Sequence, residues 1–187
     1  MNPSSTIIAS SGVFQIEYLI ETLEKDFDEL ISVSKSLKKI YGARSVLTKN
    51  TITKYFNHPE SLPFIARYRN EIIAYIVGIP LEALAQEPWT RTEQNFGKNN
   101  TIYTYTFVIK EEFRRNGYAK MLKKVFLSKA EKLTHIDYVT GHVAKGISAN
   151  FTGNIEVINQ VENWQGTGKV FEYYRREVDP EKLYKKD

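Results

Sequence analysis

The fold is decided by the stretch TIYTYTFVIKEEFRRNGYAKMLKKVFLSKAEKL, residues 101–133. Its first nine residues are rich in β-branched and aromatic side chains, a composition typical of a strand. Its last part has apolar residues at helical spacing, and these are Tyr118, Met121, Leu122, Val125, Phe126 and Leu133. A turn with two arginines and one glycine joins the two parts. A strand, a glycine turn and a helix in this order can bind phosphate, because the first helical N–H groups lack partners and the helix dipole adds positive charge.

The composition predicts an ordinary globular protein. A chain of 187 residues, 42% hydrophobic and 26% charged, is long enough for one domain with a proper core. Its aromatic content of 13% suits binding clefts and β-rich surfaces, and it suits a core equally well. We expect a single domain over residues 13–178, a flexible leader over residues 1–12 and a charged tail over residues 179–187.

Several classes of function are excluded or disfavoured. The chain has no cysteine, which excludes disulfides, thiolate catalysis and zinc–thiolate sites, and we expect no metal. It has no apolar run near the ~20 residues of a membrane span and no signal-peptide pattern, so we expect a cytoplasmic protein that binds no membrane. The net charge of +4 fits an anionic ligand. Because acids are interspersed and no nucleic-acid motif is present, nucleic-acid binding is the least favoured hypothesis.

The remaining pattern predicts an α/β fold with a mixed central sheet in the order β-α-α-β-β-β-α-β-α-β. The strands are expected at residues 13–20, 62–69, 71–79, 101–109, 136–143 and 169–178, and the helices at residues 24–41, 51–57, 118–133 and 153–163. The strongest hairpin signal is Arg69-Asn70, because asparagine tolerates the left-handed backbone of a tight turn. Residues 80–100 have weak structural signals, which indicates either a functional flap or a misread segment.

The turn in the opening stretch resembles a known family. Residues 114–119, RRNGYA, fit the Arg/Gln-x-x-Gly-x-Gly/Ala signature of the GNAT superfamily of N-acetyltransferases. The strand before the signature, the amphipathic helix after it and the next strand are also what that family requires. The resemblance implies a GNAT-like sheet with helices on both faces, and acetyl-CoA or another acyl-CoA as the donor.

The resemblance also implies which residues bind the donor. The pantetheine arm of CoA would pair with backbone groups of Phe107 and Ile109 like an added strand. Arg114 would complement the phosphate charge, and Asn150 and Asn154 are candidates for contacts to the pantetheine arm. The pyrophosphate would rest on amides of the turn, which come from Arg115, Asn116, Gly117, Tyr118, Ala119 and Lys120. Two plainer interpretations stay open: a simple helix-start glycine at this turn, and a solvated helix surface for the lysines that follow.

For catalysis, the resemblance points to the strand before the signature. Family members place a base or a pair of water-holding residues at the positions of Tyr103 and Tyr105, which share one face of the strand. A tyrosine, with an ordinary pKa near ~10, is a poor base near neutrality but can orient a water or a substrate. Packing of the cleft wall or core is the alternative. His142 could relay protons or be structural, and Glu82 is a further base candidate at the expected mouth of the cleft.

The family often carries a tyrosine on its last helix as the acid for the CoA thiolate, and Asn159 occupies that position here. Asparagine can hydrogen-bond a thiolate but cannot protonate it, which puts the acid in doubt. Tyr173 on the final strand could line the acceptor side. Trp89 is a candidate lid over the acceptor, with a plain loop anchor as the alternative.

The leading hypothesis is an enzyme, a GNAT-type N-acetyltransferase that transfers an acetyl or acyl group from acetyl-CoA to a primary amine. The amine would attack directly in a ternary complex, and the absence of cysteine is consistent with direct attack. The alternative is a GNAT-fold module that binds or senses acyl-CoA without turnover. The partner would be a small-molecule amine or a peptide amine, and a homodimer is left open.

Overall fold

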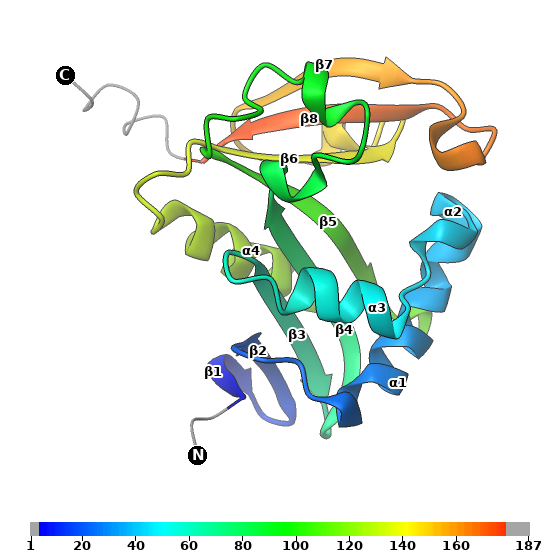
Figure 1. Cartoon of the computed structure of the whole chain (residues 1–187). Coiled ribbons are helices and arrows are strands. Elements are labelled where there is room, and N and C mark those ends of the chain that lie inside the picture. The colour runs from blue at the N-terminus through cyan, green and yellow to red at the C-terminus, as the bar shows by residue number, and fades with distance from the viewer. Residues whose placement is uncertain (1–3, 179–187) are drawn as a thin grey trace. The chain divides into compact units, whose positions relative to one another are not determined.

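The computed structural model describes residues 4–178, so the predicted charged tail at residues 179–187 lies outside the described residues. Within the described part, eight strands form one mixed sheet in the order β1-β2-β3-β4-β5-β6-β8-β7. They appear as arrows in Figure 1, with the bounds β1 Ser5–Ser11, β2 Phe14–Leu19, β3 Leu62–Tyr68, β4 Glu71–Pro80, β5 Thr101–Ile109, β6 Tyr138–Ala144, β7 Ile155–Val161 and β8 Phe171–Glu177. The mixed α/β sheet that the sequence predicts is confirmed.

The helices follow the apolar stripes of the sequence. The predicted helix over residues 24–41 is α1 Glu24–Ser34, a 3-10 turn and α2 Lys38–Tyr41, and it ends at Gly42 with φ 81°. The second predicted helix is α3 Lys49–Thr51 continued by a π-helical turn, Ile52–Phe56. Helix α4, Tyr118–Glu131, follows the glycine turn. Across residues 4–178, no helix is long and apolar enough to cross a membrane.

Two sequence expectations are wrong. Strand β1 occupies Ser5–Ser11 and pairs antiparallel with β2, where the sequence predicts a flexible leader. Strand β7 occupies Ile155–Val161 and pairs antiparallel with β8, where the sequence predicts the last helix. Ile155, Ile158 and Val161 recur every three residues and imitate a helical stripe, but β-branched residues favour a strand once a neighbour supplies the hydrogen bonds.

The predicted hairpin is confirmed. Strands β3 and β4 pair antiparallel, with Tyr68 opposite Glu71. The two turn residues between them, Arg69 and Asn70, have φ 49° and 70°. Two left-handed residues in succession match the right-handed twist of the flanking strands, which is why such turns need asparagine or glycine at one position.

The chain divides into two compact units. Of the described residues, the first unit has residues 4–78 and 105–126, and the second has residues 79–104 and 127–178. Strands β4 and β5 and helix α4 contribute residues to both units. The single domain expected over residues 13–178 stays a prediction.

In the first unit, helices cover both faces of strand β3. Phe64 contacts Phe126 of α4 at a ring distance of 6.3 Å, and Tyr68 contacts Tyr118 of the same helix at 6.0 Å. Arg67, at the opposite parity of the strand, instead binds Asp26 of α1. Because successive side chains of a strand point to opposite faces, α4 and α1 lie on opposite faces of β3.

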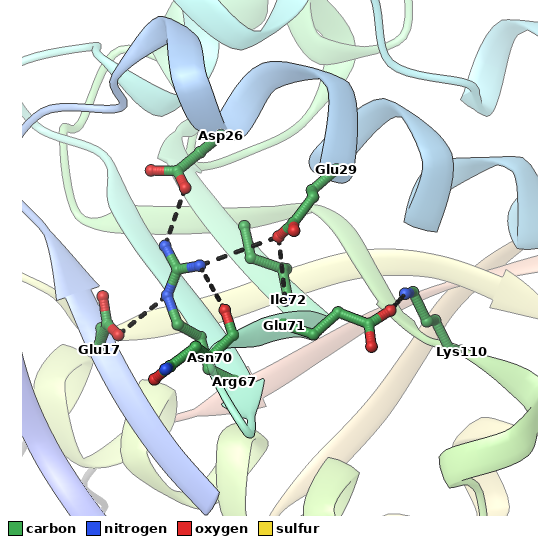
Figure 2. A network of polar contacts seen from close by, with 8 residues as sticks. All are labelled: Glu17, Asp26, Glu29, Arg67, Asn70, Glu71, Ile72 and Lys110. Atoms are coloured by element: carbon green, nitrogen blue, oxygen red, sulfur yellow. Dashed lines mark hydrogen bonds and ion pairs between the residues drawn. The ribbon is translucent and has the colours of Figure 1, made fainter.

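A polar network, drawn in Figure 2, joins α1 to the strands of the first unit. The Arg67 guanidinium reaches Glu17 of β2 at 3.0 Å, Asp26 at 2.9 Å and Glu29 at 3.8 Å. Glu29 also accepts the backbone N–H of Ile72 at 3.1 Å. Glu17 and Asp26 are buried. One guanidinium therefore pairs with carboxylates from two elements, which fixes α1 against β2 and β3.

In the second unit, the segment between β4 and β5 is folded rather than loose. It has short 3-10 turns at Leu81–Leu84 and Thr90–Thr92. The hydroxyl of the fully buried Thr90 donates to the carbonyl of Leu84 at 2.8 Å. Glu93 binds Arg175 of β8 at 2.5 Å, and both side chains are buried. Because both side chains of this ion pair are buried, the pair fixes the segment between β4 and β5 to strand β8 of the same unit.

Candidate active site

The turn before α4 has the backbone that the motif predicts. Arg115 and Gly117 have left-handed φ values of 65° and 79°, and α4 begins at Tyr118. The N–H of Met121 donates to the carbonyl of Gly117 at 3.0 Å, which is the first bond of the helix. The N–H groups of the residues in between lack intrahelical partners, as in any first helical turn. Residues 114–117 are exposed, so this turn can receive a ligand from solvent.

The start of α4 is held in place by aromatic packing. Tyr118 stacks on Phe14 of β2 with ring centroids 4.3 Å apart and planes 16° apart. A β-carbon added at Gly117 would have no atom within 4 Å, so the space beside the turn is open. Glycine is needed there for its positive φ rather than for a close contact. A rigid turn with open space beside its amides fits a pyrophosphate group.

Phe107 and Ile109 lie at the end of strand β5, a few residues before this turn in the sequence. Just past the strand, the N–H of Lys110 donates to the carbonyl of Ile73 in β4 at 2.8 Å. Since successive N–H groups of a strand alternate in direction, those of Phe107 and Ile109 are directed away from β4. Tyr105, a predicted catalytic residue, packs against Tyr55 with a ring distance of 4.2 Å.

The other predicted catalytic residues lie in the second unit, where His142 is the centre of an aromatic cluster. This cluster consists of Trp89, Tyr103, His142, Trp164 and Tyr173. The Tyr103 hydroxyl lies 2.9 Å from His142 Nδ1, and the imidazole stacks on Trp164 at 3.7 Å and 14°. Trp89 meets the imidazole edge-on at 4.8 Å.

Burial controls the charge of His142. Its side chain is 8% exposed, and desolvation lowers the pKa of His142 to about 3, from an ordinary 6.5. The imidazole is therefore neutral near pH 7, and one of its nitrogens can accept a hydrogen bond. With Nδ1 as the acceptor, the Tyr103 hydroxyl donates its proton to the imidazole. A proton stored on this imidazole is disfavoured, which argues for a fixed acceptor rather than a proton carrier.

Three of the predicted residues form a row across neighbouring strands. His142 of β6 lies opposite Tyr173 of β8, and Tyr173 lies opposite Asn159 of β7. Opposite residues of antiparallel strands share a face, so the three side chains belong to one face of the sheet. Burial raises the pKa of Tyr173. The helix predicted to carry Asn159 is absent, because this residue is exposed on a strand.

The remaining predicted residues make local contacts. Glu82 accepts the N–H groups of Gly97 and Asn99 at 2.9 and 3.0 Å, so its carboxylate closes a loop within its own segment. Asn150 is exposed in a 3-10 turn, Ser148–Asn150. Asn154 donates to Glu177 at 2.6 Å. Among residues 4–178, no group of three or more His, Asp or Glu side chains is arranged to hold a metal ion.

Sequence reasoning missed the role of Trp164. This residue follows Asn163, which has φ 51°, and precedes Gln165, which has φ 52°. Both residues have left-handed backbone conformations, which are uncommon in residues other than glycine. The loop thereby sets Trp164 flat against the His142 imidazole. The glycines at 166 and 168 predict a turn, but nothing in the sequence predicts the stacking.

Comparison with known proteins agrees with the fold and the turn. The model of the acetyltransferase (GNAT) family matches residues 21–149, and the chain therefore belongs to this family. The match includes the glycine turn, strand β5 and His142. The resemblance stated from the sequence is confirmed. No curated protein matches the chain by sequence.

Solved structures with the same fold include a GNAT-family protein from Desulfovibrio desulfuricans, with a TM-score of 0.64 at 13% identity over 89% of this chain and 99% of that one. The ribosomal-protein-S18-alanine N-acetyltransferase of Escherichia coli gives a TM-score of 0.61 at 9% identity, covering 89% of this chain and 94% of the other. A GNAT acetyltransferase from Elizabethkingia anophelis with acetyl-CoA bound gives 0.53 at 14% identity, covering 89% and 99%.

Proposed function

We propose that this protein is an N-acetyltransferase that moves an acetyl group from acetyl-CoA to a primary amine by direct attack in a ternary complex. The observation that carries the proposal is the turn before α4. Its left-handed Arg115 and Gly117 and its open, exposed surface coincide with the signature of the family to which the chain belongs. Family membership supplies acetyl-CoA as the donor, and the turn supplies a place for its phosphates.

The donor would be held by residues of the first unit. Backbone N–H groups from Arg115 to Lys120 would face the pyrophosphate, with Arg114 supplying positive charge. The N–H groups of Phe107 and Ile109, directed away from β4, would pair with the amides of the pantetheine arm as an added strand does. Acetyl-CoA supplies the activated thioester, and backbone donors beside its carbonyl would stabilise the negative charge that develops on the oxygen.

For the chemistry, the amine must be neutral when it attacks. We assign to Tyr103 the role of accepting a hydrogen bond from the amine or from a water beside it, because its own hydroxyl proton is directed to His142 Nδ1. His142 would act as a neutral acceptor that positions Tyr103, since burial opposes its protonation. Bulk water or the departing thiolate would then receive the amine proton.

The acceptor is a small-molecule amine or a peptide amine. Trp89 and Tyr173, which both contact His142, would form part of its binding surface. Aromatic faces attract ammonium groups, so an acceptor could be held in its protonated form before it loses its proton. The likeness to solved structures at 9–14% identity shows the fold alone, so the choice of amine rests on this chain's own residues.

Calorimetry with acetyl-CoA tests donor binding. We expect saturable binding to the parent protein and loss of binding in Gly117→Trp, whose indole would fill the open space beside the turn. Gly12→Trp is a matched control, because Gly12 also has a positive φ, 58°, and no atom within 4 Å of a β-carbon. Absence of binding to the parent at millimolar acetyl-CoA would refute the proposal, as would equal affinity of the parent and Gly117→Trp.

The alternative is a module that binds acyl-CoA without turnover. Two observations favour it: neither Tyr103 nor Tyr105 is a carboxylate, and Asn159 lies on an exposed strand rather than at an acid position on a helix. Release of free CoA thiol with a panel of amines separates the two functions. Amine-dependent thiol release supports the enzyme, whereas tight acetyl-CoA binding with no release above the amine-free rate supports the module.

A further inference from the structure

Strands β5 and β6 pair over a very short distance. Their parallel register covers three residue pairs and ends with Tyr103 opposite Thr140. Both strands continue past this point, β5 to Ile109 and β6 to Ala144. The first residues beyond the paired part are Thr104 and Gly141, and both belong to the second unit. The contacts of Thr104 and Gly141 therefore lie at the point where the pairing of the two strands ends.

Gly141 is the meeting point of three strands. It lies opposite Tyr174 of β8 in the antiparallel register. A β-carbon at Gly141 would lie 3.1 Å from Tyr174 Cε1, 3.2 Å from its hydroxyl oxygen and 3.4 Å from Cβ of Thr104. The Tyr174 hydroxyl hydrogen-bonds the Thr104 side chain. The tyrosine ring therefore passes across Gly141 and joins β8 to β5.

The contact is buried and cannot easily rearrange. Tyr174 is 3% exposed. Its ring is backed by Phe151, with an edge-on contact at 5.1 Å. Two of the three contacts at Gly141, both to Tyr174, are shorter than ordinary van der Waals separations for a β-carbon, so a side chain at this position would displace the tyrosine ring by a few tenths of an ångström.

We propose that Gly141, Tyr174 and Thr104 form a pin that sets the residue at which β5 leaves β6, and that this pin positions β5 for the acyl-CoA donor. Thr104 is three residues from Phe107 along the same strand. A change in the direction or register of β5 at the pin is carried to the N–H groups that would pair with the pantetheine arm. A register shift of one residue would turn those groups to the opposite side.

This inference rests on the proposed donor binding, and two ligands separate the two. Acetyl-CoA uses both the glycine turn and strand β5. Adenosine 3′-phosphate 5′-diphosphate has the pyrophosphate of CoA and lacks the pantetheine arm, so it depends on the turn alone. We expect Gly141→Ala to weaken acetyl-CoA binding by roughly tenfold, equivalent to ~1.4 kcal/mol, and to leave binding of the nucleotide within about twofold of the parent.

Two further variants complete the test. Val143→Ile adds one carbon on the same face of β6, two residues away at a half-buried position, and should leave both affinities unchanged. Tyr174→Phe keeps the ring and removes the hydroxyl bound to Thr104, so we expect a smaller loss of affinity for acetyl-CoA and no loss of affinity for the nucleotide. This variant keeps the test decisive if Gly141→Ala folds poorly. An equal loss of affinity for both ligands, or no change in either affinity, would refute the proposed role of the pin. Failure of the parent to bind acetyl-CoA would instead overturn the proposed function.

Discussion

Replacing His142 with glutamine should change how the stability of the protein depends on pH. Burial lowers the pKa of His142 to about 3, whereas the same side chain in the unfolded chain has its ordinary value of 6.5. The folded state therefore binds fewer protons than the unfolded state at any pH between these two values. It follows that the free energy of unfolding decreases as pH falls below 6.5 and that the loss continues to about pH 3.

The magnitude follows from the same two pKa values. Each unit of pH below the unfolded pKa costs about 1.4 kcal/mol of unfolding free energy. Between pH 6.5 and pH 4.5 the contribution of His142 is a loss of roughly 2 kcal/mol, because the imidazole of the unfolded chain is only half protonated at pH 6.5. That is a large fraction of the ~5–15 kcal/mol by which a typical domain is stable.

Urea denaturation of the parent and His142→Gln at several pH values between 7.5 and 4.5 measures this contribution. Carboxylates titrate in the same range, but they are common to both proteins and cancel in the difference between the two curves. His135→Gln, at an exposed histidine, controls for the loss of an imidazole as such. We expect His142→Gln to be less stable than the parent at pH 7.5 and to lose less stability on acidification. Parallel curves for the parent and His142→Gln would refute a neutral, desolvated His142.

Three further predictions concern single side chains. Arg67→Ala should lower the free energy of unfolding by about 3 kcal/mol in urea, because it leaves buried carboxylates without their cation; exposed Lys38→Ala is the control, and equal losses would contradict the role of the network. Tyr103→Phe should cost about 1–2 kcal/mol by leaving His142 Nδ1 without its donor, and should lower amine-dependent thiol release at unchanged acetyl-CoA affinity. Trp164→Ala should expose the imidazole, so NMR titration should find the pKa of His142 nearer 6.5; an unchanged pKa would show that other groups keep it buried.

Much of the fold could be predicted from the sequence because local signals agree with the tertiary environment. The hairpin at Arg69-Asn70 needs a left-handed turn, and the chain supplies an asparagine there. Gly42 ends the helix that precedes it, as the apolar stripe predicts. The prediction failed at β7 because Ile155, Ile158 and Val161 imitate a helical stripe, whereas this edge strand takes its stability from backbone bonds to β8, which its own sequence does not show.

In the candidate site too, one part could be predicted from the sequence and another could not. The glycine turn can be predicted from six consecutive residues, since the positive φ of Gly117 and the start of α4 are local properties. The surroundings of His142 could not be predicted, because its desolvation depends on Trp89, Trp164 and Tyr173, which are distant from it in the chain. Local backbone preferences can be read from neighbouring residues, whereas burial and its effect on pKa arise only from side chains that folding brings together.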